Sequence, residues 1–598
     1  MFKPLSLNKR QMSMLAASQR QAGSLMGKGG ENYRDLSQLL DPKFALKLKN
    51  YYITTDGGLI KRKGLARIFD EAGGTDPITL LDKYTDDVYL YAFAKNLKAY
   101  RISTGVKTVI KSNFIVDVAN GQRYGDYYFV ASHGDKVGRV SQTLAYDAQT
   151  GNFTTGLILV GATSGASAVI LEDSDSGVTG TLTLGNIKGV FQDNEIITDG
   201  STGSATANGA VGFTYTVVTN APIASVIRNV AAKMYVGNLS TDKTATQYSE
   251  TDTGSNPPFT TWNVGTLPTD GGKLTERNLG KVNDIEPLGN NVIIFAEDGK
   301  SAWQQSTIDS SGVATKVDTL VLEKKDFGGS RASLSVQKGV FYVNESGLWQ
   351  LVSVGQSNVP FSEQEGLATL LLGTEFFNDI DLSNASMAYD KQKTTLLIAC
   401  AKNSTNNNLV IAYNVEQKSV SEFNWSVSRF MMDSEVIYAG SADSTKVYEC
   451  FSGYDDDGVP IETEIYQELK GGDLETRQQL LGTYIQGELS ASTSLTISYD
   501  IWDRNGIYME NVLSQVWTPA IGGDLNGWGE VSWGSPWGGG VDTTNMVDSF
   551  SGGRDYIRNF QRIRVRIRGF DKVPHKLNWI RLMVRKMIPI RRRDLVKQ

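Results

Sequence analysis

The sequence predicts a mainly β protein that combines an irregular β-propeller, a β-sandwich-like platform domain formed with the chain ends, and a small inserted β domain. Short β-branched and aromatic runs recur along nearly the whole chain and are separated by Gly, Asn and Asp. Glycine occurs 61 times and proline 14 times, and helical periodicity is sparse. Strand pairs recur at intervals of about 50 residues, which is near the size of a four-stranded propeller blade.

Residues 1–75 are predicted to form an N-terminal arm and the first strands of the platform. The clearest helical signals of the whole chain lie in this arm, at Arg10–Ala22 and Tyr33–Leu40, but each offers only a thin apolar stripe. We therefore expect the arm to be extended or helical and to dock on a neighbour.

Residues 76–144 and 214–465 are predicted to form the propeller blades. Hairpin-like segments occur at Val88–Phe93 with Ala99–Ile102, Asp126–Ala131, Met234–Gly237, Val292–Trp303, Val340–Leu351, Leu396–Tyr413 and Val447–Phe451. The last four begin at residues 292, 340, 396 and 447, a rhythm typical of blades of roughly 40 to 50 residues. A pair of ordinary β-sandwiches is the alternative, because hairpin spacing alone does not separate the two architectures.

Residues 145–213 interrupt this rhythm and are predicted to form the inserted β domain. The segment Gly161–Ala168 is repeated 39 residues later as Gly200–Ala207, and a Phe precedes each copy, at Phe153 and Phe191. Two copies would make a compact, surface-mounted module. A disordered linker is disfavoured, because apolar residues are available for a core. These are Leu157, Ile158, Leu159, Val169, Ile170, Leu171, Ile196 and Ile197.

Residues 466–598 are predicted to form the C-terminal β platform domain. Strands are expected at Leu495–Tyr499 and Arg562–Arg568, and Asn578–Arg585 returns after a turn at Gly569–Pro574. The segment Arg562–Arg568 alternates Arg with Ile or Val. A strand with this pattern carries guanidinium groups on one face and branched apolar side chains on the other.

Positive charge is concentrated at the two ends of the chain. Residues 1–67 contain 13 Lys and Arg against 4 Asp and Glu, and residues 554–598 contain 15 against 3. The whole chain has a net charge of −6, so the part between the ends is strongly acidic. Such an uneven distribution of charge along the chain indicates that the protein binds partners. The candidate interface residues are Arg562, Arg564, Arg566, Arg568, Arg591, Arg592 and Arg593.

The arginine row at Arg562–Arg568 needs a neutralising partner. Acidic strands of the same or a neighbouring subunit are favoured over DNA, because guanidinium forks match carboxylates and the chain has 65 Asp and Glu. A second candidate contact is the Gly-rich segment 521–540, through Trp528, Trp533 and Trp537. Packing under a long loop at a subunit contact is favoured there over stacking on sugars or bases.

The search for catalytic groups predicts no enzyme activity and no cofactor. The two histidines, His133 and His575, lie far apart and have no local Ser or Cys partner in a recognised arrangement. Catalysis by two carboxylates is harder to exclude, since propellers can host glycosidases, but nothing singles out a pair among 65 acidic residues.

Two loops approach ligand-binding motifs without matching them. Gly23–Lys28 has three residues between its glycines where a phosphate loop needs four. Gly453–Glu464 matches several calcium-loop positions, but its first position is Gly instead of Asp, Pro460 intrudes, and no helices flank it. A tight polar turn is therefore favoured over a metal site.

Bulk properties favour folding in a reducing cytoplasm, in roughly three or four domains. No run of eighteen apolar residues occurs and the N-terminus lacks the apolar segment of a secretory signal, so export is not expected. The chain has only two cysteines, Cys400 and Cys450, which are too few to stabilise 598 residues by disulfide bonds. A disulfide between these two residues is left open.

Several short segments follow one another in an order that resembles a known family. Asn50–Gly64 contains an Asn followed by aromatic residues, a Gly-rich turn and a basic pair before Gly, with Lys63 where family members usually have Pro. Gly347–Leu351 and Ala412–Asn414 resemble the blade strands of this family, and Tyr454–Ile461 resembles its exit into the C-terminal domain. The family is the tail nozzle proteins of short-tailed bacteriophages, also called tail tubular protein B or packaged-DNA stabilisation protein.

The resemblance covers roughly residues 45–598 without the insert, and its weight lies in the order of the segments. It implies a hexameric tube at the far end of a phage tail, part of the virion and assembled in the bacterial host cytoplasm. Each subunit would contain a propeller and a platform built from both chain ends. The platform would meet the adaptor ring below the portal, and tail fibres or a needle would attach outside or below.

Genomic DNA would leave through the lumen of this tube without sequence recognition, and the tip would meet the host cell envelope. The acidic character of most of the chain would keep the channel from binding the DNA phosphates, because counterion release favours binding only where cations face the DNA strand. Two other function classes stay open. One is a glycan-binding receptor-recognition propeller of a phage tail, which would use the Trp segment and the insert, and the other is a glycan-cleaving propeller enzyme.

Overall fold

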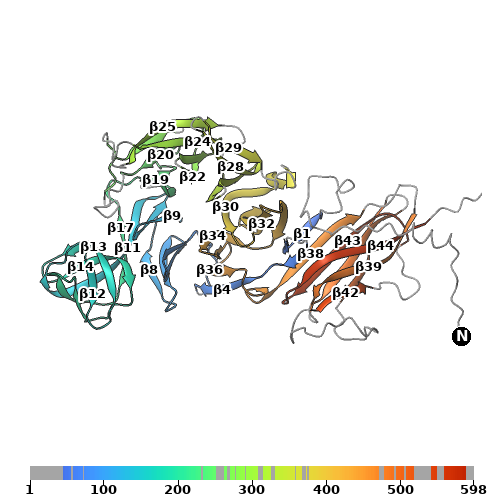
Figure 1. Ribbon diagram of the computed structural model, residues 1–598, viewed down its shortest axis with the longest axis horizontal. Helices are drawn as coiled ribbons and strands as arrows, with labels where there is room; N and C mark the ends of the chain where they lie inside the picture. Colours follow the sequence, from blue (N-terminus) through green and yellow to red (C-terminus); the bar gives the residue numbers. More distant parts are fainter. Residues whose placement is uncertain are drawn as a thin grey trace, which may run out of the picture.

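The structure is a computed structural model of the chain, almost entirely β-structure in its described part. Its long axis runs from the insert at one end, through the propeller, to the platform at the other (Figure 1). The predicted helical segments Arg10–Ala22 and Tyr33–Leu40 lie outside the described residues. The described residues are 45–54, 58–71, 73–230, 233–250, 261–265, 270–275, 278–289, 291–307, 314–324, 330–337, 339–356, 359–365, 372–373, 376–469, 477–489, 493–503, 507–517, 541–547 and 558–587.

Within these residues, seven four-stranded antiparallel sheets form the blades of the propeller. The first contains β5 (Leu80–Thr85), β6 (Val88–Phe93), β7 (Asn96–Arg101) and β8 (Lys107–Lys111). The second contains β9 (Val118–Tyr124), β10 (Tyr127–Ser132), β11 (Asp135–Gly151) and β17 (Gly212–Val217). The third contains β18 (Val226–Val230), β19 (Lys233–Gly237), β20 (Ala245–Tyr248) and β21 (Gly272–Thr275).

The remaining blades follow the same plan. The fourth contains β22 (Val282–Leu288), β23 (Asn291–Ala296), β24 (Lys300–Thr307) and β25 (Ala314–Lys324). The fifth contains β26 (Ala332–Val336), β27 (Gly339–Asn344), β28 (Gly347–Gln356) and β29 (Val359–Glu365). The sixth contains β30 (Ile380–Asp390), β31 (Thr395–Lys402), β32 (Leu409–Asn414) and β33 (Ser419–Phe423). The seventh contains β34 (Val427–Asp433), β35 (Val436–Ser441), β36 (Lys446–Cys450) and β4 (Leu65–Asp70).

The first strands of the seven blades surround a common axis. Each contacts the next in the cyclic order β5, β9, β18, β22, β26, β30 and β34, and β34 contacts β5 again. This closed cycle establishes a propeller and excludes a pair of sandwiches, in which two sheets pack face to face. The hairpin-like segments named from the sequence each fall in a different blade.

β4 closes the ring by joining the N-terminal part of the chain to the last blade. It pairs antiparallel with β36, with Leu65 opposite Cys450 and Phe69 opposite Val447. The ring of Phe69 also stacks on Tyr100 of the first blade, with 4.3 Å between ring centroids. A strand from far away in the sequence therefore completes the seventh blade and seals it against the first.

The middle strands of the blades are apolar on both faces, because neighbouring blades cover both faces. All residues of β10 and of β27 are buried. In β27, Phe341 and Val343 pack into the core shared with the sixth blade, and Val340 and Tyr342 into the core shared with the fourth. Strands buried on both sides appear in a sequence as continuous apolar runs.

Polar side chains near the axis bridge adjacent inner strands. Arg228 of β18 donates from Nε to the Ile285 carbonyl (3.0 Å) and from Nη2 to Glu286, both on β22. Asp284 of β22 accepts from the Ser333 amide (3.2 Å) and hydroxyl (2.8 Å) on β26. Burial raises the pKa of Glu286 to about 7, although the charge of Arg228 acts in the opposite direction. Such hydrogen bonds satisfy polar groups of the inner strands that lie near the propeller axis.

The insert is a closed barrel mounted on the second blade. It combines the distal half of β11 with β12 (Ile158–Gly161), β13 (Ser167–Asp175), β14 (Gly180–Lys188), β15 (Ile196–Thr198) and β16 (Ser204–Ala207). Strand pairing runs through β11, β14, β13, β12, β15 and β16 and returns to β11. β11 continues from the blade into the barrel, so blade and barrel form one connected sheet of nine strands, and closure leaves the barrel without an open edge.

Alternation along each short strand decides which residues form the core of the insert. Leu159, Ile170 and Ile197 are buried in it, as the sequence predicts. The prediction is wrong for Ile158 and Ile196, which are 59% and 57% exposed. Neighbouring residues of a strand point to opposite faces, so a continuous apolar run cannot all enter one core.

Buried carboxylates hold the turns of the two repeat copies. Glu195 accepts from the backbone amides of Thr163 (3.2 Å) and Ser164 (2.9 Å) in the first copy. Asp199 accepts from the Gly203 amide (2.9 Å) in the second. Burial by itself would raise the pKa of the Glu195 carboxyl. Hydrogen bonds to this carboxylate, first of all that from the Ser164 amide, together lower the pKa by more than burial raises it, so the net shift is downward.

The platform is a sandwich of two sheets built from both ends of the chain. One sheet contains β1 (Lys47–Lys49), β38 (Val459–Leu469), β43 (Arg558–Asp571), β40 (Leu495–Asp503) and β41 (Tyr508–Trp517). The other contains β2 (Tyr51–Ile53), β3 (Leu59–Lys61), β44 (Lys576–Met587), β39 (Arg477–Leu489) and β42 (Val541–Val547). The core between them includes Leu48, Ile465, Leu480, Ile497, Val565 and Ile567.

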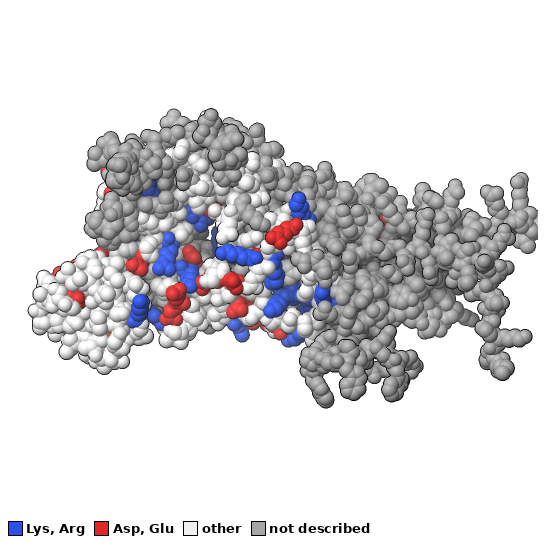
Figure 2. Space-filling model, viewed as in Figure 1, with Lys and Arg blue, Asp and Glu red and all other residues white. Residues whose placement is uncertain are grey.

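Charged side chains are unevenly spread over the surface. Figure 2 shows Lys and Arg interspersed with Asp and Glu over the propeller, whereas the insert is mainly uncharged. Many propeller charges are paired, for example Lys83 with Asp433 and Lys446 with Asp457, both at 2.9 Å. Among the described residues, no helix has the length and apolar character needed to cross a membrane.

Candidate functional site: the junction of propeller and platform

The chain crosses between the propeller and the platform at two places that lie side by side. Residues 62–64 connect β3 with β4, and residues 451–458 connect β36 with β38. The Gly64 amide donates to the Gly453 carbonyl (3.0 Å), and the Ser452 amide donates to the Gly64 carbonyl (3.1 Å). The two crossings therefore form one joint, which we call the junction.

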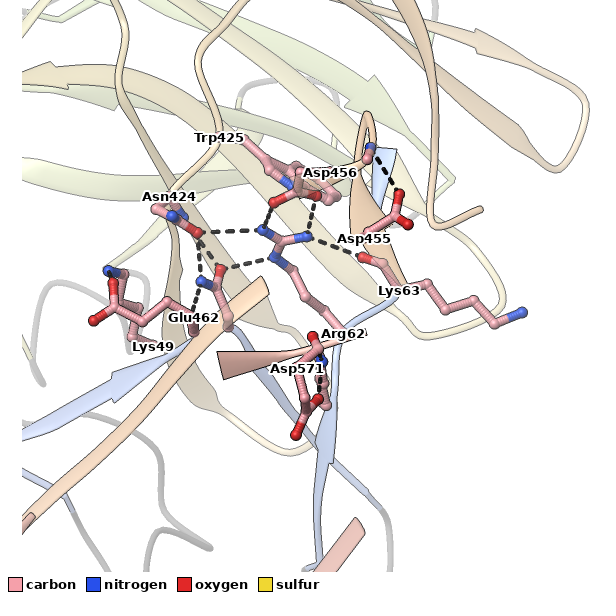
Figure 3. A network of polar contacts seen from close by, with 12 residues as sticks. Lys49, Arg62, Lys63, Asn424, Trp425, Asp455, Asp456, Glu462 and Asp571 are labelled. Carbon is pink, nitrogen blue, oxygen red and sulfur yellow. Dashed lines mark hydrogen bonds and ion pairs between the residues drawn. The ribbon is translucent and has the colours of Figure 1, made fainter. Parts of the chain in front are cut away.

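Arg62 is the buried centre of the junction, and all five of its guanidinium N–H groups are used. Nη1 and Nη2 donate to the two carboxylate oxygens of Asp456 at 2.8 and 2.6 Å. Nε donates to Asn50 Oδ1 (2.7 Å), and further bonds reach the Lys63 carbonyl (3.1 Å) and Asn424 Oδ1 (3.2 Å). Figure 3 shows these contacts converging on the guanidinium. A Lys could not make this forked arrangement.

Trp425 and Asn50 complete the packing around Arg62. The guanidinium carbon lies 4.6 Å from the ring centroid of Trp425, which donates from Nε1 to Asp456 (3.3 Å). Asn50 is fully buried and has a left-handed backbone with φ of 61°, which Asn tolerates better than most residues. Its side-chain amide donates to the Glu462 carbonyl (2.6 Å) and thereby ties β38 to the junction.

Gly64 is required by the close approach of the second crossing. A Cβ atom added at Gly64 would lie 1.6 Å from the carbonyl oxygen of Asp455. No side chain fits in that space, so the last position of the segment Asn50–Gly64 must be glycine.

A second buried cluster lies next to the junction, inside the platform. Lys61 Nζ donates to the side chain and to the backbone carbonyl of Asp571. The Tyr51 hydroxyl lies 2.9 Å from Nε2 of His575 and 3.2 Å from Oγ1 of Thr463. These contacts fasten the N-terminal strands β2 and β3 to the turn between β43 and β44.

Burial controls the protonation of this cluster. It lowers the pKa of His575 to about 4, although the charge of Asp571 acts in the opposite direction, so the imidazole is neutral near pH 7. It also lowers the pKa of Lys61, with the hydrogen bond to Asp571 opposing the shift. The side chain of His575 is 0% exposed. It therefore cannot reach an external substrate as an acid or a base.

The two cysteines are buried and free. Cys400 lies on β31 and Cys450 on β36, and the disulfide that the sequence left open is not formed. Burial raises the pKa of both thiols, which keeps them protonated and poorly reactive near pH 7.

The candidate calcium loop is a hairpin turn whose carboxylates are used within the protein. β37 (Asp455–Asp456) pairs with β38 across Asp457 and Gly458, which have φ of 49° and 87°. Asp-Gly is a preferred pair for such a turn. Asp455 accepts from the Gly458 amide (2.9 Å). Over the described ranges of the chain, no three His, Cys, Asp or Glu side chains are placed to hold a metal ion.

The arginine row of β43 faces acidic side chains of the adjacent strand β38. Arg564 donates to Glu468 (2.8 Å), and Arg566 and Arg568 pair with Glu464 at 3.3 and 3.1 Å. The antiparallel register places Arg564 opposite Glu468 and Arg568 opposite Glu464. The alternate residues of β43 enter the platform core, namely Ile563, Val565 and Ile567. Three arginines of the row are therefore paired within the chain, with two glutamates between them.

Exposure differs along the row. The side chains of Arg564 and Arg566 are 20% and 19% exposed, whereas Arg568 is 48% exposed. Arg564 also lies over the ring of Trp502 on β40, 4.4 Å from its centroid. Arg568 is thus more open to an external partner than the other two.

The remaining candidate interface residues divide between β43 and segments outside the described residues. Arg562 belongs to β43, where its backbone is in register with Trp502 of β40. Arg591, Arg592, Arg593, Trp528, Trp533 and Trp537 lie outside the described residues. Contacts of these side chains with another subunit stay predictions.

No local sequence pattern marks the junction as a site. Arg62 and Asp456 are 394 positions apart, so no local pattern connects them. A signal was nevertheless present, because Asn50 and Arg62 lie in the segment Asn50–Gly64 and Asp456 lies in Tyr454–Ile461. Both segments carry the family resemblance.

No family model and no curated protein matches the chain. The solved structures that match the chain include the WD40 β-propeller domain of Doa1, with 9% identity and a TM-score of 0.34, covering 65% of this chain and 96% of that chain. The computationally designed Ika8 protein matches with 11% identity and a TM-score of 0.33, covering 64% and 99%. At such TM-scores the likeness supports no conclusion, and the propeller is established by strand pairing and the cycle of inner strands.

Proposed function

We propose that this protein is a structural subunit of a bacteriophage tail, a hexameric nozzle that forms the distal part of the DNA-ejection channel. In this role it docks to the adaptor ring and to tail fibres or a needle. One observation carries the proposal. The segments Asn50–Gly64 and Tyr454–Ile461, by which the sequence resembles nozzle proteins, converge on the buried guanidinium of Arg62.

A rigid junction suits a subunit in the wall of a tube. The platform and the propeller are joined by two chain crossings, and Arg62 bonds to both. A buried charge with all its donors satisfied favours one geometry, because any other arrangement leaves a charge without a partner. Such a joint keeps the platform and the propeller aligned when DNA moves past the wall.

The charge distribution supports weak contact with DNA. Arg564, Arg566 and Arg568 are paired with glutamates of the same chain, and the whole chain has a net charge of −6. Because adhesion to phosphate requires cations that face the strand, a wall with this charge lets the genome slide.

The mass of the purified full-length protein tests the proposal. Light scattering coupled to size-exclusion chromatography should give a ring of six 65.3 kDa chains, and electron microscopy should place the protein at the tail tip of purified virions. A trimer would favour a fibre or a receptor-binding protein. A chain that is monomeric at every concentration and missing from virions would refute the nozzle, and release of reducing ends from envelope polysaccharide would favour an enzyme.

A further inference from the structure

Arg429 of β34 occupies a position near the propeller axis where three blades meet. Its Nε donates to the Thr79 carbonyl (3.1 Å), and its Nη1 lies 3.5 and 3.4 Å from the carbonyl oxygens of Asn384 and Ala385. Thr79 directly precedes β5 of the first blade, and Asn384 and Ala385 belong to β30 of the sixth. Since the guanidinium reaches the blades on both sides of its own, it lies at the inner edge of the seventh blade.

The groups that accept hydrogen bonds from Arg429 are all neutral. They are backbone carbonyls, including that of Ser428 (3.4 Å), and Arg429 forms no ion pair within the described part of the chain. Among the same residues, its Nη2 has no acceptor. Arg62 and Arg228 differ in this respect, because each has a carboxylate within hydrogen-bonding distance. A guanidinium that is largely removed from water is unfavourable unless its charge is balanced.

The carboxylate that acts on Arg429 belongs to the far side of the ring. Asp284 lies on β22 of the fourth blade, which is across the axis in the cyclic order of inner strands. This carboxylate accepts two hydrogen bonds from Ser333 and lies 3.8 Å from Nη2 of Arg228. Burial lowers the pKa of Arg429, although the charge of Asp284 acts in the opposite direction. The charge of Arg429 is therefore only partly balanced within the chain.

We propose that the propeller axis binds a small inorganic anion, of the chloride or phosphate class, at the guanidinium of Arg429. Nη2 supplies N–H donors, and charge-assisted hydrogen bonds from guanidinium groups to anions are strong. The side chain of Arg429 is partly exposed, so a small ion can reach it from solvent. The proposal goes beyond the role in a phage tail, because it needs only the closed ring of blades within one chain.

A bound anion would stabilise the part of the propeller where the ring closes. Arg429 contacts the sixth and the first blade, and its own blade is completed by β4 from the N-terminal part of the chain. A ligand that binds only the folded state stabilises that state by mass action. The stability of the propeller should therefore depend on the anion concentration.

Thermal unfolding of the full-length protein in increasing sodium chloride, and separately in sodium phosphate, tests the proposal. With at least one of these anions, the unfolding temperature of the wild type should rise with the logarithm of the anion concentration, and Arg429→Gln should lose this rise. General effects of salt act on both proteins and cancel in the difference between them. The matched control is Arg67→Gln, which removes a charge from the same blade at a side chain that is 47% exposed and should keep the rise.

A role of Arg429 in packing alone predicts a different result. Arg429→Gln would then unfold at a lower temperature than the wild type by the same amount at every concentration of either anion, and the proposal would be refuted.

The wild-type protein decides the question if Arg429→Gln does not fold. Crystals of the full-length chain are soaked in bromide, which replaces chloride, or in arsenate, which replaces phosphate. We expect an anomalous scattering peak within hydrogen-bonding distance of the Arg429 guanidinium for at least one of the two ions. A peak with neither ion overturns the proposal, and the proposed tail function is unaffected by either outcome.

Discussion

Arg62 lies where the chain leaves the platform, between the carboxylate of Asp456 and the ring of Trp425. Moving a guanidinium from water into such a site is unfavourable unless every donor finds an acceptor. The acceptors come from Asn50 on one side of the junction and from Asp456 and Asn424 on the other. At the scale of one residue, Arg62 therefore sets the geometry of the whole joint.

We predict that Arg62→Met lowers the free energy of unfolding by about 3–5 kcal/mol, because Asp456 loses its buried partner. Arg67→Met is the matched control. Its side chain is 47% exposed and pairs with Asp457 at 3.4 Å, so the loss should stay below about 1 kcal/mol. Urea unfolding followed by tryptophan fluorescence measures both, and equal losses would contradict the role given to Arg62.

His575 is predicted to make the stability of the platform depend on pH. Its pKa is about 4 in the folded chain and 6.5 for the free side chain, so the unfolded chain binds more protons between these values. The contribution of His575 is fully present above pH 6.5 and is lost as the pH falls toward 4, by about 3 kcal/mol in total.

His575→Gln removes this contribution and provides the measurement. The difference in unfolding free energy between wild type and variant should fall by about 3 kcal/mol between pH 7 and pH 4. Other acidic groups affect both proteins alike and cancel in the difference. A difference that stays constant over this range would show that His575 does not stay neutral in the folded chain.

At the scale of elements, the insert shows how a blade can carry a domain without losing its own sheet. The chain leaves the blade along β11 and returns on β17, where Thr143 lies directly opposite Gly212. The insert has its own core, in which Phe153 and Phe191 from the two repeat copies are both buried. Blade and barrel therefore share one strand, and the barrel has its own core, although Leu171 of the insert packs against the core between the second and third blades.

We predict that residues 144–211 can be replaced by Asn-Gly without loss of the propeller. A two-residue Asn-Gly turn connects strand positions that lie directly opposite each other, and the second blade then resembles the other blades. Circular dichroism and thermal unfolding should show a folded β protein. Deletion of residues 282–324, which removes the fourth blade, is the control and should prevent folding, because the cycle of inner strands cannot close. If both deletions fail alike, the insert is not an independent unit.

At the scale of the whole molecule, residues 47–70 contribute strands to both the platform and the propeller. β1, β2 and β3 belong to the platform, and β4 belongs to the seventh blade. Leu48 and Tyr51 enter the platform core, and Phe69 packs between the seventh and the first blade. The fold is therefore complete only when residues from both ends of the described chain have met.

A chain that begins at residue 76 is predicted not to fold, because the seventh blade keeps three strands and the platform loses its N-terminal strands. Soluble yield and circular dichroism measure this outcome. The replacement of residues 144–211 removes a segment of similar length and is expected to be tolerated. A folded chain from residue 76 would show that β4 is dispensable for closure.

Patterns that act over a few residues were sufficient to predict much of the fold. Turn residues and apolar runs indicated the blade hairpins, because these signals depend on the residue itself and its near neighbours. The repeat at Phe153 and Phe191 indicated the insert, and the Asp457-Gly458 turn followed from backbone preference alone. The alternation in Arg562–Arg568 correctly separated an apolar face from a charged one.

Tertiary structure decided everything that depends on distant partners. It decided the number of blades and the use of β4 in the last blade. It also brought Arg62 to Asp456. The pairing of β4 and the contact of Arg62 both depend on residues that are hundreds of positions apart. Register within the barrel turned Ile158 and Ile196 outward, against the prediction from the sequence. A residue's preference for a strand is local, whereas its partner is selected only when the ring and the sandwich close and each buried polar group must find its counterpart.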